Sequence, residues 1–439
     1  MGDEMKGLGK MPKYLATFWL MFFLLTALLV LSALIPRAAI QKNMERSAKE
    51  LCRHKGTYNM VRGLHASKMD PNADAIWLSI AYGYDSKKPL SSVLWSKYRY
   101  EENVGPNVKL LEQVRDHRGG NREYLRYWHG GNVLVRLLHL VTDIRGIYRF
   151  NGFLMIALLL ATGIRLWKSE QRTLAIGWVG SLAAAGIWFV PFCLEYTWVI
   201  LWTMWITYLV AGKSLAGKWE NLDILFLLDG MVTVYLDFFT TESLSLLLPL
   251  LLAMGIHRKL SGDWRRSDQV NTLRYVVLWL VGYVGMWISK WILAAMVLQI
   301  DPLPYVRGHA AQWLGNEVYG KRPFSLLALI YQAVAGNLSC LFPLCIKGAG
   351  LALALGIAIA YAYLMFVYRQ DSRKSGLISS YLLLAMIPFV RILVLHSHGF
   401  QHYFFTYRAF GGSVLALYLI LMEETEGRWL WNVRRKRRT

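Results

Sequence analysis

The sequence has little charge for its length. Only 18% of its 439 residues are Asp, Glu, Lys or Arg, whereas soluble domains usually carry about a quarter. Hydrophobic residues make up 55% of the chain, and apolar runs of about 18 residues or more recur along it, each long enough to cross a bilayer. These proportions exclude an ordinary soluble domain and predict an integral membrane protein.

Cysteine is scarce as well, and its spacing excludes a redox or zinc motif. The four cysteines, Cys52, Cys193, Cys340 and Cys345, form no CxxC pair. Cys340 and Cys345 could pair if their segment lies outside the cytoplasm, but apolar packing is the favoured interpretation. No internal repeat is visible either, which disfavours the inverted-repeat architecture of many transporters.

Acidic residues are in the minority. The chain has 49 Lys and Arg against 28 Asp and Glu, a formal net charge of +21. In a membrane protein this excess belongs to loops that face anionic lipid. The run RRKRR at 434–438 therefore suits a cytoplasmic membrane surface, and nucleic acid is the less favoured partner for it.

The apolar runs predict about ten transmembrane helices. The first, roughly 14–35, is interpreted as an uncleaved signal-anchor, because it is long and leucine-rich and no A-x-A site follows it. The others are expected at 151–167, 173–192, 197–212, 222–239, 243–257, 273–298, 347–368, 376–396 and 405–422. Three aspartates in 222–239 make a re-entrant segment almost as good an interpretation of that run.

Basic segments between these spans fall on alternate ends, which predicts that both termini are cytoplasmic. The expected divisions are a tail with the first transmembrane helix (1–36), an extracytoplasmic loop with amphipathic helices (37–149), a transmembrane bundle (150–298), a second extracytoplasmic loop with an interfacial helix (299–346), C-terminal transmembrane helices (347–424) and a basic cytoplasmic tail (425–439). The compact composition and the lack of an organelle retrieval signal favour a bacterial plasma membrane.

Two cations stand inside expected spans, where ionisable side chains are costly and indicate function. Lys290 lies in the outer half of 273–298, and Arg391 lies near the outer end of 376–396. One interpretation is that they snorkel to the outer headgroups. The other is a pocket for a phosphate, which Arg meets as a planar fork and Lys as a point charge.

Histidines gather at the mouth of the last two spans, in HSHGFQHYFFTYR. This stretch holds His396, His398, His402 and Arg408. The H-x-H pattern invites a metal-site hypothesis, but no carboxylate or Cys lies nearby in the sequence, so no cofactor is indicated and a divalent metal stays an open alternative. A wet rim that contacts phosphate is favoured, and interfacial stacking is the alternative.

Acidic candidates occur at two places on the outer side. Asp74 lies in the first turn of a short amphipathic helix predicted in KMDPNADAIWLSIAYGY, where a carboxylate favours the helix dipole. Asp237, in LLDGMVTVYLDFFTTES, could hold a sugar hydroxyl or a cation, or cap a helix.

A further stretch, YLRYWHGGNVLVRLLHLVTDIRGIYRFN at 124–151, brings Arg, His, Trp and a double glycine to the edge of a span. Such an approach suits a site that handles a charged lipid headgroup.

These features resemble the GT-C superfamily of glycosyltransferases, polytopic enzymes that take sugar from a polyprenyl-phosphate donor. In that superfamily the first span leads to a large extracytoplasmic loop with an acid and an Ala-rich amphipathic helix, to which Asp74-Ala75 and Ile80-Ala81 are similar. YLRYWHGG at 124–131 is similar to the return of that loop. The chain departs from the pattern because no second acid accompanies Asp74 and because glycines replace prolines after the histidine.

The resemblance implies an all-α polytopic fold with about ten transmembrane helices and a large first loop, and it makes Asp74 the candidate general base. The chemistry needs a carboxylate for the acceptor hydroxyl and cations for the departing phosphate. The expected ligands of the donor phosphate are Lys290, Arg391, His402 and Arg408. The expected residues of the substrate loop are Arg126, Trp128, His129, His396, His398 and Asp237.

The expected partners are a polyprenyl-phosphate-linked sugar, a glycan, lipid or protein acceptor, and membrane lipids, without nucleic acid. Functions of other classes stay open at this point. They are a transporter or flippase for a lipid-linked or anionic substrate, a polymerase or ligase of envelope glycans, and a non-catalytic envelope assembly factor.

Overall fold

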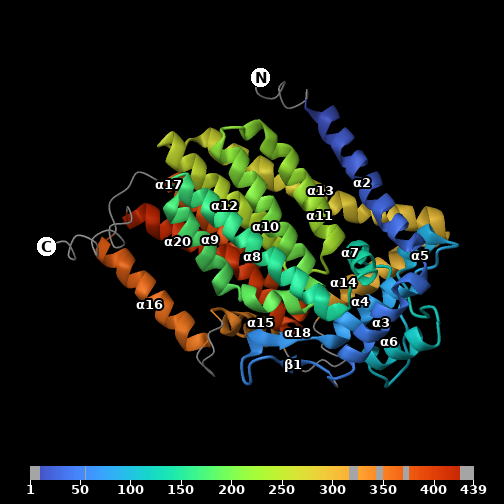
Figure 1. Ribbon diagram of the computed structural model, residues 1–439. Coiled ribbons are helices and arrows are strands. Elements are labelled where there is room, and N and C mark those ends of the chain that lie inside the picture. Colours follow the sequence, from blue (N-terminus) through green and yellow to red (C-terminus); the bar gives the residue numbers. More distant parts are fainter. Residues whose placement is uncertain (1–9, 55, 316–324, 343–349, 369–374, 426–439) are drawn as a thin grey trace.

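The computed structural model describes residues 10–54, 56–315, 325–342, 350–368 and 375–425. The regular secondary structure of these residues is helical, apart from one short antiparallel pair of strands, β1 (Tyr58–Asn59) and β2 (Lys68–Met69). Figure 1 shows a bundle of long helices with the first-loop elements at one end. The predicted all-α class is therefore confirmed for this part of the chain.

Seven of the described helices are long and apolar enough to cross a membrane. Their bounds are α2 (Met11–Leu34), α8 (Ile144–Lys168), α10 (Leu194–Leu215), α12 (Glu242–Ser261), α13 (Arg266–Leu298), α17 (Ser375–Val394) and α20 (Phe410–Thr425), the last continuing a helical run from Tyr403. Their outer faces keep large apolar side chains exposed. The protein is therefore an integral membrane protein by length and composition of its helices.

Three further expected spans are helical but shorter. They are α9 (Arg172–Ala184), α11 (Leu222–Leu236) and α16 (Gly350–Tyr368), whose described apolar part covers Leu355–Val367. The apolar run of α9 continues past Gly186 as the 3-10 helix η2 (Ile187–Phe192). A straight crossing needs about 20 helical residues, so seven helices meet the requirement.

The aspartates of α11 explain why its sequence is ambiguous. At its start, Asp223 accepts hydrogen bonds from Lys10 Nζ (3.1 Å), Tyr14 Oη (2.7 Å) and Arg274 Nε (2.9 Å). The helix therefore begins beside the starts of α2 and α13. Its last turn instead meets the first loop, because the Tyr235 carbonyl accepts from the amide of Gly130 (2.9 Å). The described α11 thus contacts α2 and α13 at its start and the first loop at its last turn.

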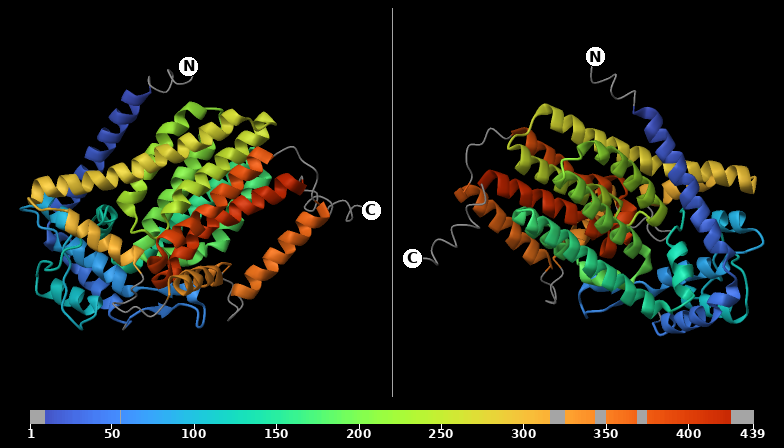
Figure 2. Two further views of the ribbon diagram at one scale, coloured as in Figure 1. Left: turned by 180° about the vertical axis from the view of Figure 1, so that it is seen from behind. Right: turned by 45° about the horizontal axis from the view of Figure 1, so that its top comes forward.

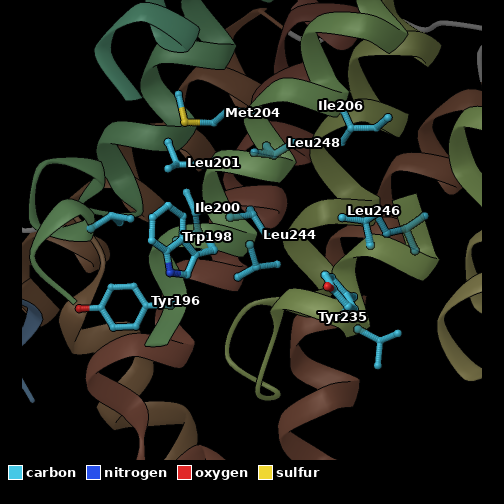
Figure 3. Packing of buried hydrophobic residues seen from close by; sticks show 14 of the residues in the cluster. Tyr196, Trp198, Ile200, Leu201, Met204, Ile206, Tyr235, Leu244, Leu246 and Leu248 are labelled. Atoms are coloured by element: carbon cyan, nitrogen blue, oxygen red, sulfur yellow. The ribbon is translucent and has the colours of Figure 1, made fainter. Parts of the chain in front are cut away.

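The bundle core is built from α10, α11, α12 and α13. Figure 3 shows apolar side chains of α10, α11 and α12 pointing into one cluster. Close contact between α11 and α13 depends on glycine. A Cβ at Gly230 would lie 2.0 Å from the Trp279 carbonyl oxygen, and one at Gly282 would lie 2.2 Å from that of Leu227. Small residues let membrane helices approach in this way.

The first loop folds into a helical layer over one end of the bundle (Figures 1 and 2). Its helices are α3 (Arg37–Leu51), α4 (Pro71–Gly83), α5 (Pro89–Trp95), α6 (Pro106–Arg115) and α7 (Asn132–His139), with the 3-10 turn η1 (His65–Ser67). Asp70 caps α4 by accepting from the amides of Asn72 (3.0 Å) and Ala73 (3.2 Å). This leaves the Asp74 carboxylate available for tertiary contacts.

The described parts of 299–346 and the histidine-rich segment lie at the same end as the first loop. They comprise α14 (Leu303–Leu314), α15 (Leu326–Cys340), α18 (His396–Gln401), α19 (Tyr403–Thr406) and the 3-10 turn η4 (Tyr407–Ala409). Elsewhere in the chain, the 3-10 turn η3 (Trp219–Asn221) precedes α11. Both α14 and α15 pack against α18. Cys340 is buried as a free thiol in this small core, whereas Cys345 lies outside the described residues.

Candidate functional site

The return of the first loop is fixed to the C-terminal half of α13. Lys290 Nζ donates to the carbonyl of Tyr127, and the Trp128 indole donates to the carbonyl of Met286 (3.0 Å). The Trp287 indole donates to the carbonyl of Arg126 (3.3 Å). Lys290 is buried, so its ammonium holds loop backbone in a place where an unpaired charge would be costly.

The double glycine of this return is required by close contacts. A Cβ at Gly130 would lie 2.1 Å from the ring of Tyr235, and one at Gly131 would lie 2.6 Å from the ring of Trp77. The preceding His129 adopts φ 57°, in the left-handed region. The chain turns here against aromatic rings, and only a residue without a side chain fits.

We expect Gly130→Ala to destabilise the protein by roughly 1–3 kcal/mol, the usual cost of overpacking a dense core. Gly163→Ala in α8 is a matched control, because no atom lies within 4 Å of its added Cβ. Thermal unfolding in detergent should show a lower melting temperature for Gly130→Ala. The melting temperature of Gly163→Ala should be the same as that of the wild type. Equal melting temperatures would contradict this account of the double glycine.

Asp74 caps a helix, but not the one that carries it. Its Oδ1 accepts from the amide of Leu194 (2.8 Å), the first residue of α10, and its Oδ2 accepts from the hydroxyl of Tyr148. The side chain is buried. Burial raises the pKa of Asp74 to about 7, although the bonds from Tyr148 and Leu194 act in the opposite direction. Asp74 thus fastens α4 to the start of α10, whose first amides lack partners within the helix.

The raised pKa predicts a pH dependence of stability. The folded state holds the Asp74 proton up to about pH 7, whereas the free carboxyl loses it near 3.8. The contribution of Asp74 is therefore fully present below the lower value and is lost as the pH rises through the higher one. We expect the melting-temperature difference, wild type minus Asp74→Asn, to fall between about pH 4 and about pH 7. Asp143→Asn, at the N-cap of α8, is the control, and a constant difference for Asp74→Asn would contradict the prediction.

Glu195 is a carboxylate that the sequence analysis missed. Glu195 directly follows Leu194, whose amide donates to Asp74, so this hydrogen bond also positions the backbone of Glu195. Its side chain is half-buried and forms no hydrogen bond or ion pair with the described residues. It lies within electrostatic range of Asp70, Asp237 and Arg126. A single acid at the start of an apolar run is typical of an ordinary helix start, so its sequence context gave no signal.

Asp237 and Glu242 bracket the turn between α11 and α12. The Asp237 carboxylate accepts from the amides of Thr240 (3.1 Å) and Thr241 (3.4 Å) and from the Thr240 hydroxyl, so it holds the turn. Glu242 forms a buried ion pair with Arg391.

Arg391 also donates to the carbonyl of Phe239 in the same turn. Its Nη1 has no partner among residues whose positions are described. Arg391 thereby ties α17 to this turn and does not snorkel, because the side chain is buried.

His398 and His402 form a pair beside this turn. Their ring centroids are 4.8 Å apart, and the Trp313 ring lies edge-on to both, at 4.7 and 5.6 Å. Burial lowers the pKa of both rings, that of His402 to about 3, and the charges of Arg126 and Arg391 act in the same direction. Both imidazoles are therefore neutral at pH 7. No group of three or more His, Cys, Asp or Glu side chains that could hold a metal ion occurs within the described ranges.

Arg408 lies in a buried aromatic pocket. Its guanidinium carbon is 4.4 Å from the ring centroid of Tyr196 and 4.8 Å from that of Tyr407. Nη1 donates to the carbonyl of Phe404 (3.2 Å), whereas Nε and Nη2 have no partner in the described part of the chain. The hydroxyl of Tyr196, next to Glu195, is also unpartnered there.

The structure therefore brings most of the predicted residues to one end of the bundle. Arg126 from the first loop acts on both histidines and on Glu195, and the Trp77, Tyr127 and His129 rings pack on Phe238 of the α11–α12 turn. Lys290 instead contacts the backbone of the first loop, at the carbonyl of Tyr127. His396 is buried near Leu393 in the C-terminal region, and none of the interactions described here joins it to the other two histidines.

An apolar pocket of about 390 Å³ opens beside this end of α13. It is lined by side chains of α13 and α14, including Trp287, Trp291, Leu303 and Val306. Trp287 closes its inner end, since its indole bonds to Arg126 and its ring lies 6.2 Å from that of Phe239. The pocket therefore opens on the apolar flank of the bundle, and Trp287 separates it from Arg126.

We name the charged and aromatic residues at this end the outer cluster. It comprises Asp74, Arg126, Glu195, Tyr196, Asp237, Glu242, Arg391, His398, His402 and Arg408. Five separate segments of the chain contribute to it, so its members are distant in sequence. No protein-family model, no curated protein and no solved structure matches this chain.

Proposed function

We propose that the protein is a membrane glycosyltransferase of the GT-C type, which moves a sugar from a polyprenyl-phosphate donor to an extracytoplasmic glycan, lipid or protein acceptor. The reaction would take place at the outer cluster. The proposal includes about ten membrane crossings, with α9, α11 and α16 added to the seven longer helices, both termini in the cytoplasm, and a bacterial plasma membrane as the location.

The observation that carries this proposal is the set of unpartnered polar atoms in the outer cluster. Among described residues, Arg391 Nη1, Arg408 Nε and Nη2, and the Tyr196 hydroxyl lack hydrogen-bond partners although they are buried. Buried polar groups are nearly always paired, and exceptions need an explanation. A phosphate would satisfy such donors, because arginine binds it in bidentate geometry.

Glu195 is the better placed of the two candidate bases. Both oxygens of Asp74 already accept hydrogen bonds, from Leu194 and Tyr148, whereas the Glu195 carboxylate is half-buried and unpartnered in the described chain. Asp74 then acts as a positioning residue, because it fixes the start of α10. That Asp74 is itself the general base stays a prediction from the sequence, and the proposed reaction uses Glu195 in that role.

The chemistry follows from these positions. The acceptor hydroxyl gives its proton to Glu195 as its oxygen attacks the anomeric carbon of the sugar. The bond between that carbon and the phosphate oxygen breaks, and the polyprenyl phosphate leaves with the bonding electrons. Arg391 and Arg408 stabilise the charge that develops on the phosphate, a term that is large in a buried site. The pocket lined by Trp287 and Trp291 suits the start of the polyprenyl chain.

The test is donor binding by the whole protein in lipid nanodiscs. We expect a polyprenyl monophosphate to bind at least tenfold more tightly than the polyprenol of equal length, since each arginine contact to phosphate is worth more than about 1 kcal/mol. Binding would be measured by native mass spectrometry. When a polyprenyl-phosphate sugar and an acceptor that carries a free hydroxyl are added together, the sugar should pass to the acceptor and free polyprenyl phosphate should be released.

Equal binding of the two lipids would overturn the proposed donor. Movement of the intact lipid between leaflets, without cleavage of the sugar–phosphate bond, would favour a flippase instead.

A further inference from the structure

A second pocket, of about 490 Å³ and with a polar lining, lies in the first loop away from the outer cluster. Its lining includes Arg37, Lys88, Trp95, Lys97, Gly119 and Leu298. No residue of this pocket belongs to the outer cluster, and the proposed glycosyl transfer leaves the pocket without a role.

The pocket lies at the height where two membrane helices end. Arg37 begins α3 three positions after α2 ends at Leu34, and Leu298 is the last residue of α13. Between them lies α5, which packs against both α2 and α13. Figure 1 shows α5 at the junction of these two long helices. The pocket therefore lies at the level of the lipid headgroups.

The charge of the pocket is strongly one-sided. Arg37, Lys88 and Lys97 are cationic, and none of the three forms an ion pair with the described residues. Asp85 is the single acid of the lining, and its carboxylate already accepts from the amide of Lys87 (2.9 Å). Three cations against one acid leave an excess of positive charge in one concave site, which attracts an anion.

The walls of the pocket are fixed and leave room for a ligand. Arg37 donates to the carbonyls of Gly83 (2.8 Å) and Tyr84 (3.3 Å), which holds its guanidinium in place. At Gly119 an added Cβ would be 3.9 Å from Arg37 Nη2, so the missing side chain keeps the space beside the guanidinium open. The Lys97 ammonium lies 5.1 Å from the centre of the Trp95 ring.

The rim of the pocket faces hydrocarbon. Leu34 at the end of α2 is 46% exposed, and Val297 and Leu298 at the end of α13 line the pocket itself. Such side chains at the ends of membrane helices contact acyl chains. A ligand that enters here therefore meets cations with its polar end and apolar surface with the rest.

We propose that this pocket binds the phosphate headgroup of an anionic phospholipid of the outer leaflet, with its acyl chains beside Leu34 and Leu298. The phosphate lies between Lys88 and Lys97 on the one side and Arg37 on the other. The hydroxyls of Ser91 and Ser92 line the same space and suit a glycerol headgroup. The lipid would hold the first loop at a constant height on the membrane.

The test uses the full-length protein in nanodiscs that contain phosphatidylglycerol and phosphatidylcholine. Native mass spectrometry would count the lipids that stay bound after partial delipidation. We expect the wild type to retain phosphatidylglycerol selectively. The double variant Lys88→Gln/Lys97→Gln should bind it about 25-fold more weakly, about fivefold for each lysine.

Two variants separate the pocket from general surface charge. Lys42→Gln/Arg46→Gln removes the same charge from exposed positions of α3 that do not line the pocket, and should change retention less than about twofold. Gly119→Phe keeps every cation but fills the cavity, and should lose retention as the lysine variant does.

A wild type that retains both lipids equally would overturn the proposal, as would a lysine variant that behaves like the α3 control. Inorganic phosphate is the remaining probe. If it binds the wild type but not the lysine variant, and phosphatidylglycerol is not enriched, the pocket takes a free phosphate and the proposed lipid is wrong.

Discussion

Glu195→Gln is expected to reduce sugar transfer by about 10²–10⁴-fold, the usual contribution of a general base, while donor binding is unchanged. The amide keeps the size of the carboxylate but cannot take a proton. Because the Glu195 side chain makes no hydrogen bond with the described residues, its replacement should leave the melting temperature unaltered. Turnover would be measured as polyprenyl phosphate released from a polyprenyl-phosphate sugar, in parallel with donor binding.

The matched comparison is Asp74→Asn. Asn can still accept from the amide of Leu194, so a positioning residue predicts a much smaller loss, and the remaining activity should keep the pH profile set by Glu195. If Asp74→Asn abolishes transfer and Glu195→Gln does not, the roles of the two acids are reversed. Normal turnover in both variants would contradict the proposal that glycosyl transfer takes place at this site.

Arg391→Met is expected to destabilise the protein by about 3–5 kcal/mol, because it leaves the carboxylate of Glu242 buried without its partner. Both side chains of this pair are almost entirely buried, so solvent screens the loss little. The change also removes the bond to the carbonyl of Phe239, which holds the α11–α12 turn against α17. Thermal and denaturant unfolding in detergent would measure the loss.

The double variant Arg391→Met/Glu242→Gln separates the structural role of the pair from its proposed role in phosphate binding. Replacing both partners removes the unpaired charge, so most of the stability should return. Binding of polyprenyl monophosphate should stay weak, because the cation is still missing. If binding returns together with stability, Arg391 does not contact the donor. A single variant as stable as the wild type would show that the ion pair is not buried in solution.

The membrane character could be predicted from sequence because hydrophobic length is a local property. Each apolar run of α2, α8, α12 and α13 spans about the thickness of a bilayer, and the structure contains a continuous helix for each. The number of spans was less certain for a physical reason. In α9 and α11, residues such as Gly186 and Asp237 end the helix before the apolar run ends.

The composition of the outer cluster was predicted only in part. Charged residues inside apolar runs are visible in any sequence, so Arg391 and Arg408 stood out. Glu195 did not, because an acid that begins a helix is common. Lys290 carried the same signal as Arg391, yet it bonds the loop backbone at Tyr127. Sequence shows that a charge is buried but not what compensates for it.

By itself, the sequence determined that the chain is rich in long apolar helices suited to a membrane, and it marked the cations and histidines within or beside them. These properties depend on residues close together in the chain. Only the tertiary structure decided that Asp74 caps α10, that Gly130 and Gly131 fit against the rings of Tyr235 and Trp77, and that Arg391 pairs with Glu242. Those contacts join residues more than a hundred positions apart or depend on ring positions, and only the packing of the helices fixes which side chains meet.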